Sequence, residues 1–421
     1  MSEPVLDAVR AGFARSNRVF WLDGGGARDW SGRRSLVGVL AEDDVSLSLD
    51  AARQEVTRHQ GGRAEVVGTD IFAVLEEEVA RDAGDPDVHW VGCFGYASRP
   101  DLPARAWGHG PDAIWMRSSD IQFFDHGRVP EHAPGRVEGH PTATPEWYGR
   151  AFAHVQEQLR AGNSYEVNLT YREELPSTAV DHRDVLETYL RLRASNPAPY
   201  AGLLSHRGTH LLSSSPERYA TIDRQRWLET KPIKGTTPRG AGEPEDEALR
   251  AQLAQDPRFR GENLMIVDLL RNDLSMVCEV GTVEVPSLME VESYATVHQL
   301  VSTVRGRLRA DVSTLGALRA LFPAGSMTGA PKLRTMQIID DVETTPRGLY
   351  AGAFGWICAD GRADLGVVIR SLYAGPDGVW RVGTGGGITV RSDVDGEWAE
   401  TLWKAGRMRA AVTETPLLDS P

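Results

Sequence analysis

Short apolar runs separated by glycine, proline and polar turns recur along the whole chain, and this pattern predicts more strands than helices. Before residue 125 it predicts a strand over 19–23, a helix over 70–81 and a buried strand over 90–96. After residue 164 it predicts strands over 165–171, 210–214, 219–222, 351–357 and 365–373, a β-rich stretch near 281–285, a hairpin over 379–390, and helices over 262–272, from Pro331 onward and over 397–412. Because strands occur in runs instead of alternating with helices, we expect an α+β fold.

The segment after residue 143 carries the start and stop signals of a further helix. Thr144 fits an N-cap and Pro145 the first helical position, while Gly162 fits the end. The predicted buried stripe consists of apolar residues at helical spacing: Trp147, Ala151, Val155 and Leu159.

The clearest break in composition lies just before this helix, where a stretch is rich in Gly, Pro and His and lacks apolar periodicity. A chain of 421 residues also exceeds the usual size of a single core, so we expect either two lobes or one large elaborated core. The sequence therefore predicts an N-terminal lobe over 1–124, a linker over 125–145, a catalytic domain over 146–412 and a tail over 413–421.

Composition excludes several classes of protein. A net charge of −13 argues against a nucleic-acid binder. The three cysteines are too few and too far apart for a disulfide framework or a zinc site. The N-terminus shows no charged-then-apolar leader, and no apolar run approaches the length of a membrane span, so we expect a cytoplasmic protein with no membrane contact.

Lysine is rare, and Lys234 has the most suggestive surroundings of the four lysines among 46 basic residues. A lysine that loses its proton becomes a nucleophile, which arginine cannot do. Lys231 and Arg239 are close in sequence and would lower the pKa of Lys234 by like-charge repulsion. The alternative is a lysine that caps a turn between two prolines.

Carboxylates on two predicted helices are candidates for a metal site. Glu397 and Glu400 share one face of the last helix, with Lys404 one turn further on. Glu262 opens an earlier helix. Carboxylates from separate helices can hold Mg²⁺, which takes few protein ligands. The alternative is that acidic residues simply favour helix N-termini.

The glycines Gly385, Gly386 and Gly387 stand in a predicted strand and lack the lysine and helix of a phosphate loop. They predict close approach of a ligand, with backbone N–H groups free for an anion. Arg370 is a candidate carboxylate clamp or an exposed strand arginine. Cys93 fits a buried strand cysteine better than a nucleophile.

Several segments, taken together and in this order, resemble the chorismate-binding enzymes. They are Ser-Pro-Glu-Arg-Tyr at 215–219, Lys-Pro-Ile-Lys-Gly-Thr at 231–236, the Glu-Asn-Leu-Met segment at 262–273, Val-His-Gln-Leu-Val-Ser at 297–302, the Phe-Pro-Ala-Gly-Ser-Met-Thr-Gly-Ala-Pro-Lys segment at 322–332, Val-Ile-Arg at 368–370, the triple glycine and the Glu-x-x-Glu helix. The resemblance is dense over 147–408. It implies a two-lobed fold with antiparallel sheets packed together at the core and helices outside.

The resemblance also implies a mechanism on chorismate. Mg²⁺ would bind the ring carboxylate through Glu262 and Glu400, with Glu397 beside them. Relatives that form anthranilate usually carry alanine where Lys234 stands, whereas those that form aminodeoxychorismate carry a lysine that attacks the ring. Glu217 matches the general acid/base that protonates the leaving hydroxyl.

Further substrate contacts are implied for Arg370, Gly235, Thr236, Thr328, Lys404, His298, Trp356 and the triple glycine. Trp356 stands where many relatives have a tyrosine, and Glu166 where they often have glutamine.

We therefore expect an aminodeoxychorismate-forming enzyme that supplies 4-aminobenzoate for folate or a specialised metabolite. Its ammonia would come from a separate glutamine amidotransferase subunit, because the chain leaves no room for a glutaminase domain. The alternatives are anthranilate formation and a catalytically silent regulatory or scaffolding subunit.

Overall fold

The structure is a computed structural model, and it describes residues 4–26, 31–127, 142–175, 182–294 and 297–413. Most of the predicted linker and nearly all of the predicted tail lie outside the described residues.

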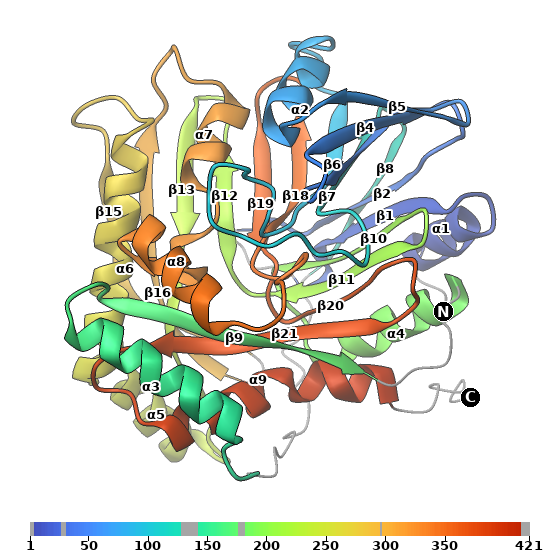
Figure 1. Cartoon of the computed structure of the whole chain (residues 1–421). Coiled ribbons are helices and arrows are strands. Elements are labelled where there is room, and N and C mark those ends of the chain that lie inside the picture. The colour runs from blue at the N-terminus through green and yellow to red at the C-terminus, as the bar shows by residue number, and fades with distance from the viewer. Residues whose placement is uncertain (1–3, 27–30, 128–141, 176–181, 295–296, 414–421) are drawn as a thin grey trace.

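Two large antiparallel sheets form the centre of the molecule (Figure 1). The first sheet has nine strands in the order β17 (Gly329–Ala330), β9 (Glu166–Leu175), β21 (Trp380–Ile388), β20 (Ser371–Ala374), β11 (Thr209–Ser215), β10 (Tyr200–His206), β1 (Arg18–Asp23), β2 (Arg34–Val39) and β8 (Ile121–Asp125).

The second sheet has twelve strands. Their order is β14 (Ile233–Pro238), β16 (Val297–Arg307), β13 (Trp227–Lys231), β12 (Arg218–Ile222), β19 (Ala363–Val367), β18 (Ala353–Cys358), β6 (His89–Phe94), β7 (Ala113–Ser118), β3 (Ser46–Asp50), β4 (Glu55–Gln60) and β5 (Arg63–Gly68), while β15 (Glu284–Ser293) pairs with β16 alone.

Helices lie outside the sheets, which confirms the predicted α+β class (Figure 1). They are α1 (Pro4–Phe13), α2 (Ile71–Ala80), α3 (Glu146–Arg160), α4 (His182–Ser195), α5 (Glu243–Gln255), α6 (Pro257–Ser275), α7 (Thr314–Leu321), α8 (Lys332–Val342) and α9 (Val394–Thr413), with 3₁₀ turns at Gly24–Gly26 and Gly325–Met327. Helix α9 runs along β21, and α3 along β9.

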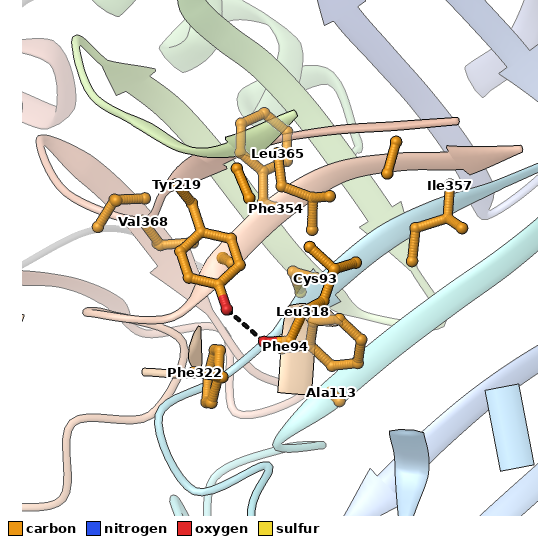
Figure 2. Packing of buried hydrophobic residues seen from close by; sticks show 14 of the residues in the cluster. Cys93, Phe94, Ala113, Tyr219, Leu318, Phe322, Phe354, Ile357, Leu365 and Val368 are labelled. Carbon is orange, nitrogen blue, oxygen red and sulfur yellow. Dashed lines mark hydrogen bonds between the residues drawn. The ribbon is translucent and has the colours of Figure 1, made fainter. Parts of the chain in front are cut away.

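Both sheets contain strands from both halves of the chain. Strand β1 pairs with β10, and β6 pairs with β18. Figure 2 shows one result of this pairing, because Cys93 and Phe94 of β6 pack in the same cluster as Phe354 and Leu365. In that cluster the Tyr219 hydroxyl donates to the Leu318 carbonyl at 2.6 Å. The predicted division near residues 125–145 therefore does not separate two cores.

The structure confirms one predicted helix and changes the cap and the buried face of another. The helix predicted over 70–81 is α2, and Asp70 caps it by accepting hydrogen bonds from two backbone N–H groups. In α3 the N-cap is Pro145, not Thr144. Val155 and Leu159 are buried as predicted, but Tyr148 and Phe152 are buried in place of Trp147 and Ala151. Trp147 is 44% exposed, whereas Tyr148 is 1% exposed, because packing against β9 and α8 selects the Tyr148 face.

Candidate active site

A cavity of about 130 Å³ lies where β14, β21, α6 and α9 meet. All but three of the predicted site residues line it: Glu217, Lys234, Gly235, Thr236, Glu262, Arg370, Gly385, Gly386, Gly387, Glu397, Glu400 and Lys404. Four carboxylates and several cations thus face one space, although they come from segments far apart in sequence.

Three residues predicted to contact substrate do not line this cavity. His298 is fully buried, with Nε2 3.0 Å from Asp246 Oδ1, on the side of β16 opposite to its neighbour Gln299, which lines the cavity. The Thr328 hydroxyl points back to backbone carbonyls such as that of Gly325 at 3.3 Å. Trp356 lines a second, smaller cavity of about 60 Å³ beside Asp23. None of the three forms part of the proposal below.

Lys234 lies on β14, and its ammonium donates a hydrogen bond to Glu166 Oε1 on β9. Burial alone would lower the pKa of Lys234. The negative charges of Glu166, Glu262 and Glu217 outweigh burial and raise it. The amine therefore rests in its protonated form, beside an acceptor.

The two cations expected to lower the pKa of Lys234 are paired with other carboxylates. Lys231 Nζ lies 2.8 Å from Glu292 Oε1, and Arg239 Nε lies 2.7 Å from Asp246 Oδ1. The prediction of like-charge repulsion is therefore wrong, because each of these cations has its own carboxylate partner.

Glu217 lies in the turn between β11 and β12 and is 5% exposed. It accepts a hydrogen bond of 2.5 Å from the Ser326 hydroxyl. Burial raises its pKa to about 7. A carboxyl that titrates near neutrality can both give and take a proton, which is the requirement for general acid/base chemistry.

The remaining carboxylates come from two helices. Burial raises the pKa of Glu262 on α6 to about 7, and that of Glu397 on α9 is also raised, by burial and by the charge of Glu400. Lys404, whose Nζ lies 2.6 Å from Glu400 Oε1, lowers the pKa of Glu400. Crowded carboxylates of this kind are stabilised by a cation.

Among the described residues no three His, Cys, Asp or Glu side chains are already gathered as a metal cluster. Glu262 and Glu400 nevertheless face the same cavity from different helices. Their oxygen donors fit Mg²⁺, which fills most of its octahedron with water and substrate oxygens.

The triple glycine makes room for charged side chains. A Cβ atom on Gly387 would stand 2.2 Å from Glu166 Oε1 and 3.0 Å from Lys234 Nζ, and one on Gly386 would stand 3.0 Å from Glu397 Oε2. The backbone of this stretch pairs with β9 along one edge, whereas the pairs between β20 and β21 are at Arg381 and Val382. These glycines therefore shape the cavity by the absence of side chains.

Arg370 lies in the break between β19 and β20, at a positive φ of 51°. Its guanidinium stands 5.2 Å from the centre of the Trp403 ring, and burial lowers its pKa to about 10, so it remains protonated at neutral pH. No ion pair joins it to a carboxylate in the part of the chain that the structure describes. Arg370 is thus available to an anionic ligand.

Sequence reasoning missed several residues of the cavity. Arg258 lies 3.7 Å from Glu262, one turn away on α6, and this spacing could have identified it. Phe259 of α6, Asn168 of β9 and Tyr350 also line the space, and no local pattern distinguishes them from core or surface residues.

All three cysteines are buried and unpaired. Burial raises the pKa of Cys93 to about 12 and those of Cys278 and Cys358 to about 11. None has the lowered pKa of an activated thiolate, so the prediction of Cys93 as a buried strand cysteine is confirmed.

The part of the chain that forms this cavity is similar in sequence to a known protein family. Residues 111–410, which include every lining residue of the cavity, match the chorismate binding enzyme family. The chain belongs to the chorismate-binding enzymes. Within this family it is 38% identical to a Streptomyces pristinaespiralis protein named aminodeoxychorismate synthase, over 97% of this chain and 63% of the relative. It is 42% identical to component 1 of the aminodeoxychorismate synthase of Klebsiella aerogenes, over 62% of this chain and 57% of the relative.

A solved structure supports the fold of this family. Anthranilate synthase component I from Streptococcus pneumoniae superposes with a TM-score of 0.73 at 25% identity, covering 89% of this chain and 92% of that one. The chain spans less than two thirds of the length of the two aminodeoxychorismate synthase relatives. No helix of the described chain is long and apolar enough to cross a membrane.

Proposed function

We propose that this chain is an aminodeoxychorismate synthase component I, which converts chorismate and ammonia to 4-amino-4-deoxychorismate. The observation that carries the proposal is Lys234, a buried amine in the same cavity as Glu217 and Arg370. Relatives named for this activity support it.

Chorismate is a dicarboxylate, and Arg370, Lys404 and Arg258 supply positive charge around the cavity. The Lys234 amine attacks the ring in an allylic displacement, and the ring hydroxyl leaves as water with a proton from Glu217. Ammonia then displaces the lysine, and Glu217 recovers its proton from the new ammonium group. The near-neutral pKa of Glu217 suits both directions.

Glu262 and Glu400 would hold Mg²⁺, with Glu397 beside them as a direct or water-mediated ligand. When bound, the ion orients the substrate carboxylate and neutralises its charge. The repulsion among these carboxylates supports the assignment, since a cation relieves it.

Ammonia is scarce at neutral pH because most of it is ammonium. None of the cysteines has the low pKa of a glutaminase nucleophile. We propose a separate glutamine amidotransferase subunit as the source, and the name of the Klebsiella relative, component 1, supports a partner.

Anthranilate formation is the second candidate, since the solved relative has that activity in its name. The two are separated by incubating the chain with chorismate, Mg²⁺ and an ammonium salt and identifying the product by mass, before and after adding an aminodeoxychorismate lyase. We expect a product that the lyase converts to 4-aminobenzoate. Anthranilate as the product would overturn the proposal.

The lysine is tested in the same assay. Lys234→Ala should lose several orders of magnitude in turnover while still binding chorismate, each factor of ten being about 1.4 kcal/mol of barrier. Lys231→Ala is the matched control, because Lys231 ends β13, the strand that precedes β14 in the chain, and pairs with Glu292 outside the cavity. Near wild-type turnover of Lys234→Ala with saturating ammonia would remove Lys234 from the mechanism.

A further inference from the structure

Glu166 is a buried carboxylate that the reaction described so far does not use. It lies on β9, its side chain is 1% exposed, and its Oε1 accepts a hydrogen bond from Lys234 Nζ. Its second oxygen, Oε2, is buried and has no hydrogen-bond partner in the described chain. A buried carboxylate with one oxygen lacking a hydrogen bond lowers the stability of the fold, which suggests that Glu166 is kept beside the nucleophile for a functional role.

The fold makes space for this pair. Gly387 of β21 stands opposite Asn168 in the β9 ladder, and a Cβ atom there would overlap Glu166 Oε1 at 2.2 Å and crowd Lys234 Nζ at 3.0 Å. Two strands are thus arranged so that the carboxylate and the amine meet at the cavity wall.

Lys234 can attack only as the free amine, yet every charged group identified as acting on it is negative. Glu166 approaches from β9, Glu262 from α6 and Glu217 from the turn between β11 and β12, and each favours the ammonium. The proton on Nζ therefore needs a local destination before the carbon–nitrogen bond forms.

We propose that Glu166 is the proton acceptor that converts Lys234 to the free amine once chorismate fills the cavity. The inference deepens the proposed function and rests on it. Glu217 is reserved for the leaving hydroxyl, and Glu262 for the metal, so Glu166 is the carboxylate in contact with Nζ that has no other task.

The proton transfers balance over one turnover. One proton moves from Lys234 Nζ to Glu166, and the freed electron pair forms the bond to the ring while the ring hydroxyl departs as water with the proton of Glu217. When ammonia displaces the lysine, Nζ leaves as a neutral amine and takes its proton back from Glu166. Glu217 is reprotonated by the new ammonium group, so both carboxyls return to their starting states.

Substrate binding supplies the driving force for this transfer. An ammonium–carboxylate pair is favoured while water can reach it, but removing water favours the neutral amine and carboxylic acid. Burial already acts to lower the pKa of Lys234, and a ligand that fills the cavity adds to that effect.

The chain contains a matched control in a second buried lysine–carboxylate pair. Lys332 Nζ lies 2.9 Å from Asp273 Oδ2 and also donates to the Leu321 carbonyl at 2.7 Å. Neither residue lines the cavity. Asp273→Asn therefore removes a comparable charge without touching the reacting amine.

The test measures formation of the lysine adduct in the absence of ammonia. Wild type, Glu166→Gln and Asp273→Asn are mixed with chorismate and Mg²⁺, quenched and digested. The peptide that contains Lys234 should gain the mass of chorismate minus water. At neutral pH we expect Glu166→Gln to be at least about 100-fold slower than wild type, the usual contribution of a positioned base. Asp273→Asn should form the adduct at the wild-type rate.

The pH profile distinguishes a proton acceptor from a structural contact. In Glu166→Gln solvent must remove the proton, so adduct formation should accelerate about tenfold per pH unit below the pKa of the amine, approaching wild type at high pH. Adduct formation in Glu166→Gln as fast as or faster than wild type would overturn the inference, because Glu166 would then only hold the ammonium. An equal loss at every pH would also overturn it.

Two further results keep the inference separate from the proposed function. If Glu166→Gln does not fold, Glu166→Asp should react more slowly with the wild-type pH profile, and a profile that rises with pH would overturn the inference. If wild type forms no adduct and Lys234→Ala still turns over, the proposed function fails instead.

Discussion

Glu343 and Glu217 are both buried glutamates, but their surroundings differ. Glu343 directly follows α8 and accepts hydrogen bonds from Arg172 at 2.7 Å, from Arg347 at 2.8 Å, and from the backbone and hydroxyl of Thr170 at 2.9 and 2.7 Å. Burial alone would raise its pKa, but the two guanidiniums lower it to about 2. Glu217 accepts one hydrogen bond, from Ser326, and burial raises its pKa to about 7.

The difference separates a structural charge from a chemical one. Glu343 is satisfied on every side, so it holds β9, α8 and the following loop together and stays ionised at any physiological pH. Glu217 has unused acceptor capacity and faces a cavity. Its instability as an anion is what allows it to exchange a proton with a ligand.

Adding or removing a divalent cation should distinguish the cavity carboxylates from Glu343 more strongly than any other change. The cavity carboxylates Glu262 and Glu400 have capacity for a metal, whereas Glu343 has none left. We expect EDTA to abolish turnover, and Mg²⁺ to restore it and raise the melting temperature of wild type. Glu262→Gln and Glu400→Gln should raise the Mg²⁺ requirement steeply. Full activity in EDTA would remove the metal from the mechanism.

Glu217→Gln should give the next largest effect, which is on the rate of turnover. Loss of a positioned acid lowers turnover by about 10²- to 10⁴-fold, or about 3–5 kcal/mol of barrier. Folding should survive, because the amide can still accept from Ser326. Turnover is measured with saturating ammonia beside a melting curve; a variant with less than about a tenfold loss would assign the proton transfer to another group.

The sequence predicted the strands, helices and cavity residues that have a local pattern or belong to a family motif. Strands β1, β6 and β11 were predicted because buried strands are short apolar runs between turns, and the helix predicted over 397–412 corresponds to α9. Lys234 was a candidate because lysine is rare in this chain, but its role as nucleophile and the selection of Glu217 came from the family resemblance.

What the sequence missed depends on distant contacts. Glu166 and Lys234 are separated by 68 residues, and no local signal places one beside the other. In α3 the spacing from Trp147 fits as well as that from Tyr148, and only packing selects between them. His298 and Gln299 are adjacent on β16, so the choice of which one faces the cavity depends on the register of the strand.

Glu343→Gln should affect stability more than any cavity substitution. It leaves Arg172 and Arg347 without their shared carboxylate, and breaking a buried ion pair costs about 3–5 kcal/mol. We expect a lower denaturant midpoint at neutral pH, with turnover per folded molecule retained below the transition. A melting temperature equal to that of wild type would mean that Thr170 and the arginines repack without the charge.

The last prediction is that the free energy of unfolding depends on pH with opposite signs through Glu217 and through Glu343. The pKa of Glu217 is about 7 in the fold against an ordinary 4.5, so the native state binds more protons between these values and loses stability as pH rises through them. Removing the charge should therefore make Glu217→Gln more stable relative to wild type at pH 8 than at pH 5, by up to about 3 kcal/mol.

The pKa of Glu343 is about 2, so its contribution to stability is complete above pH 4.5 and is lost as pH falls towards 2. Denaturant titrations of both Gln variants and wild type across this range, without metal or substrate, measure the two windows. The same pH dependence in Glu217→Gln and wild type would mean that Glu217 is not protonated at neutral pH and that another group carries the acid role.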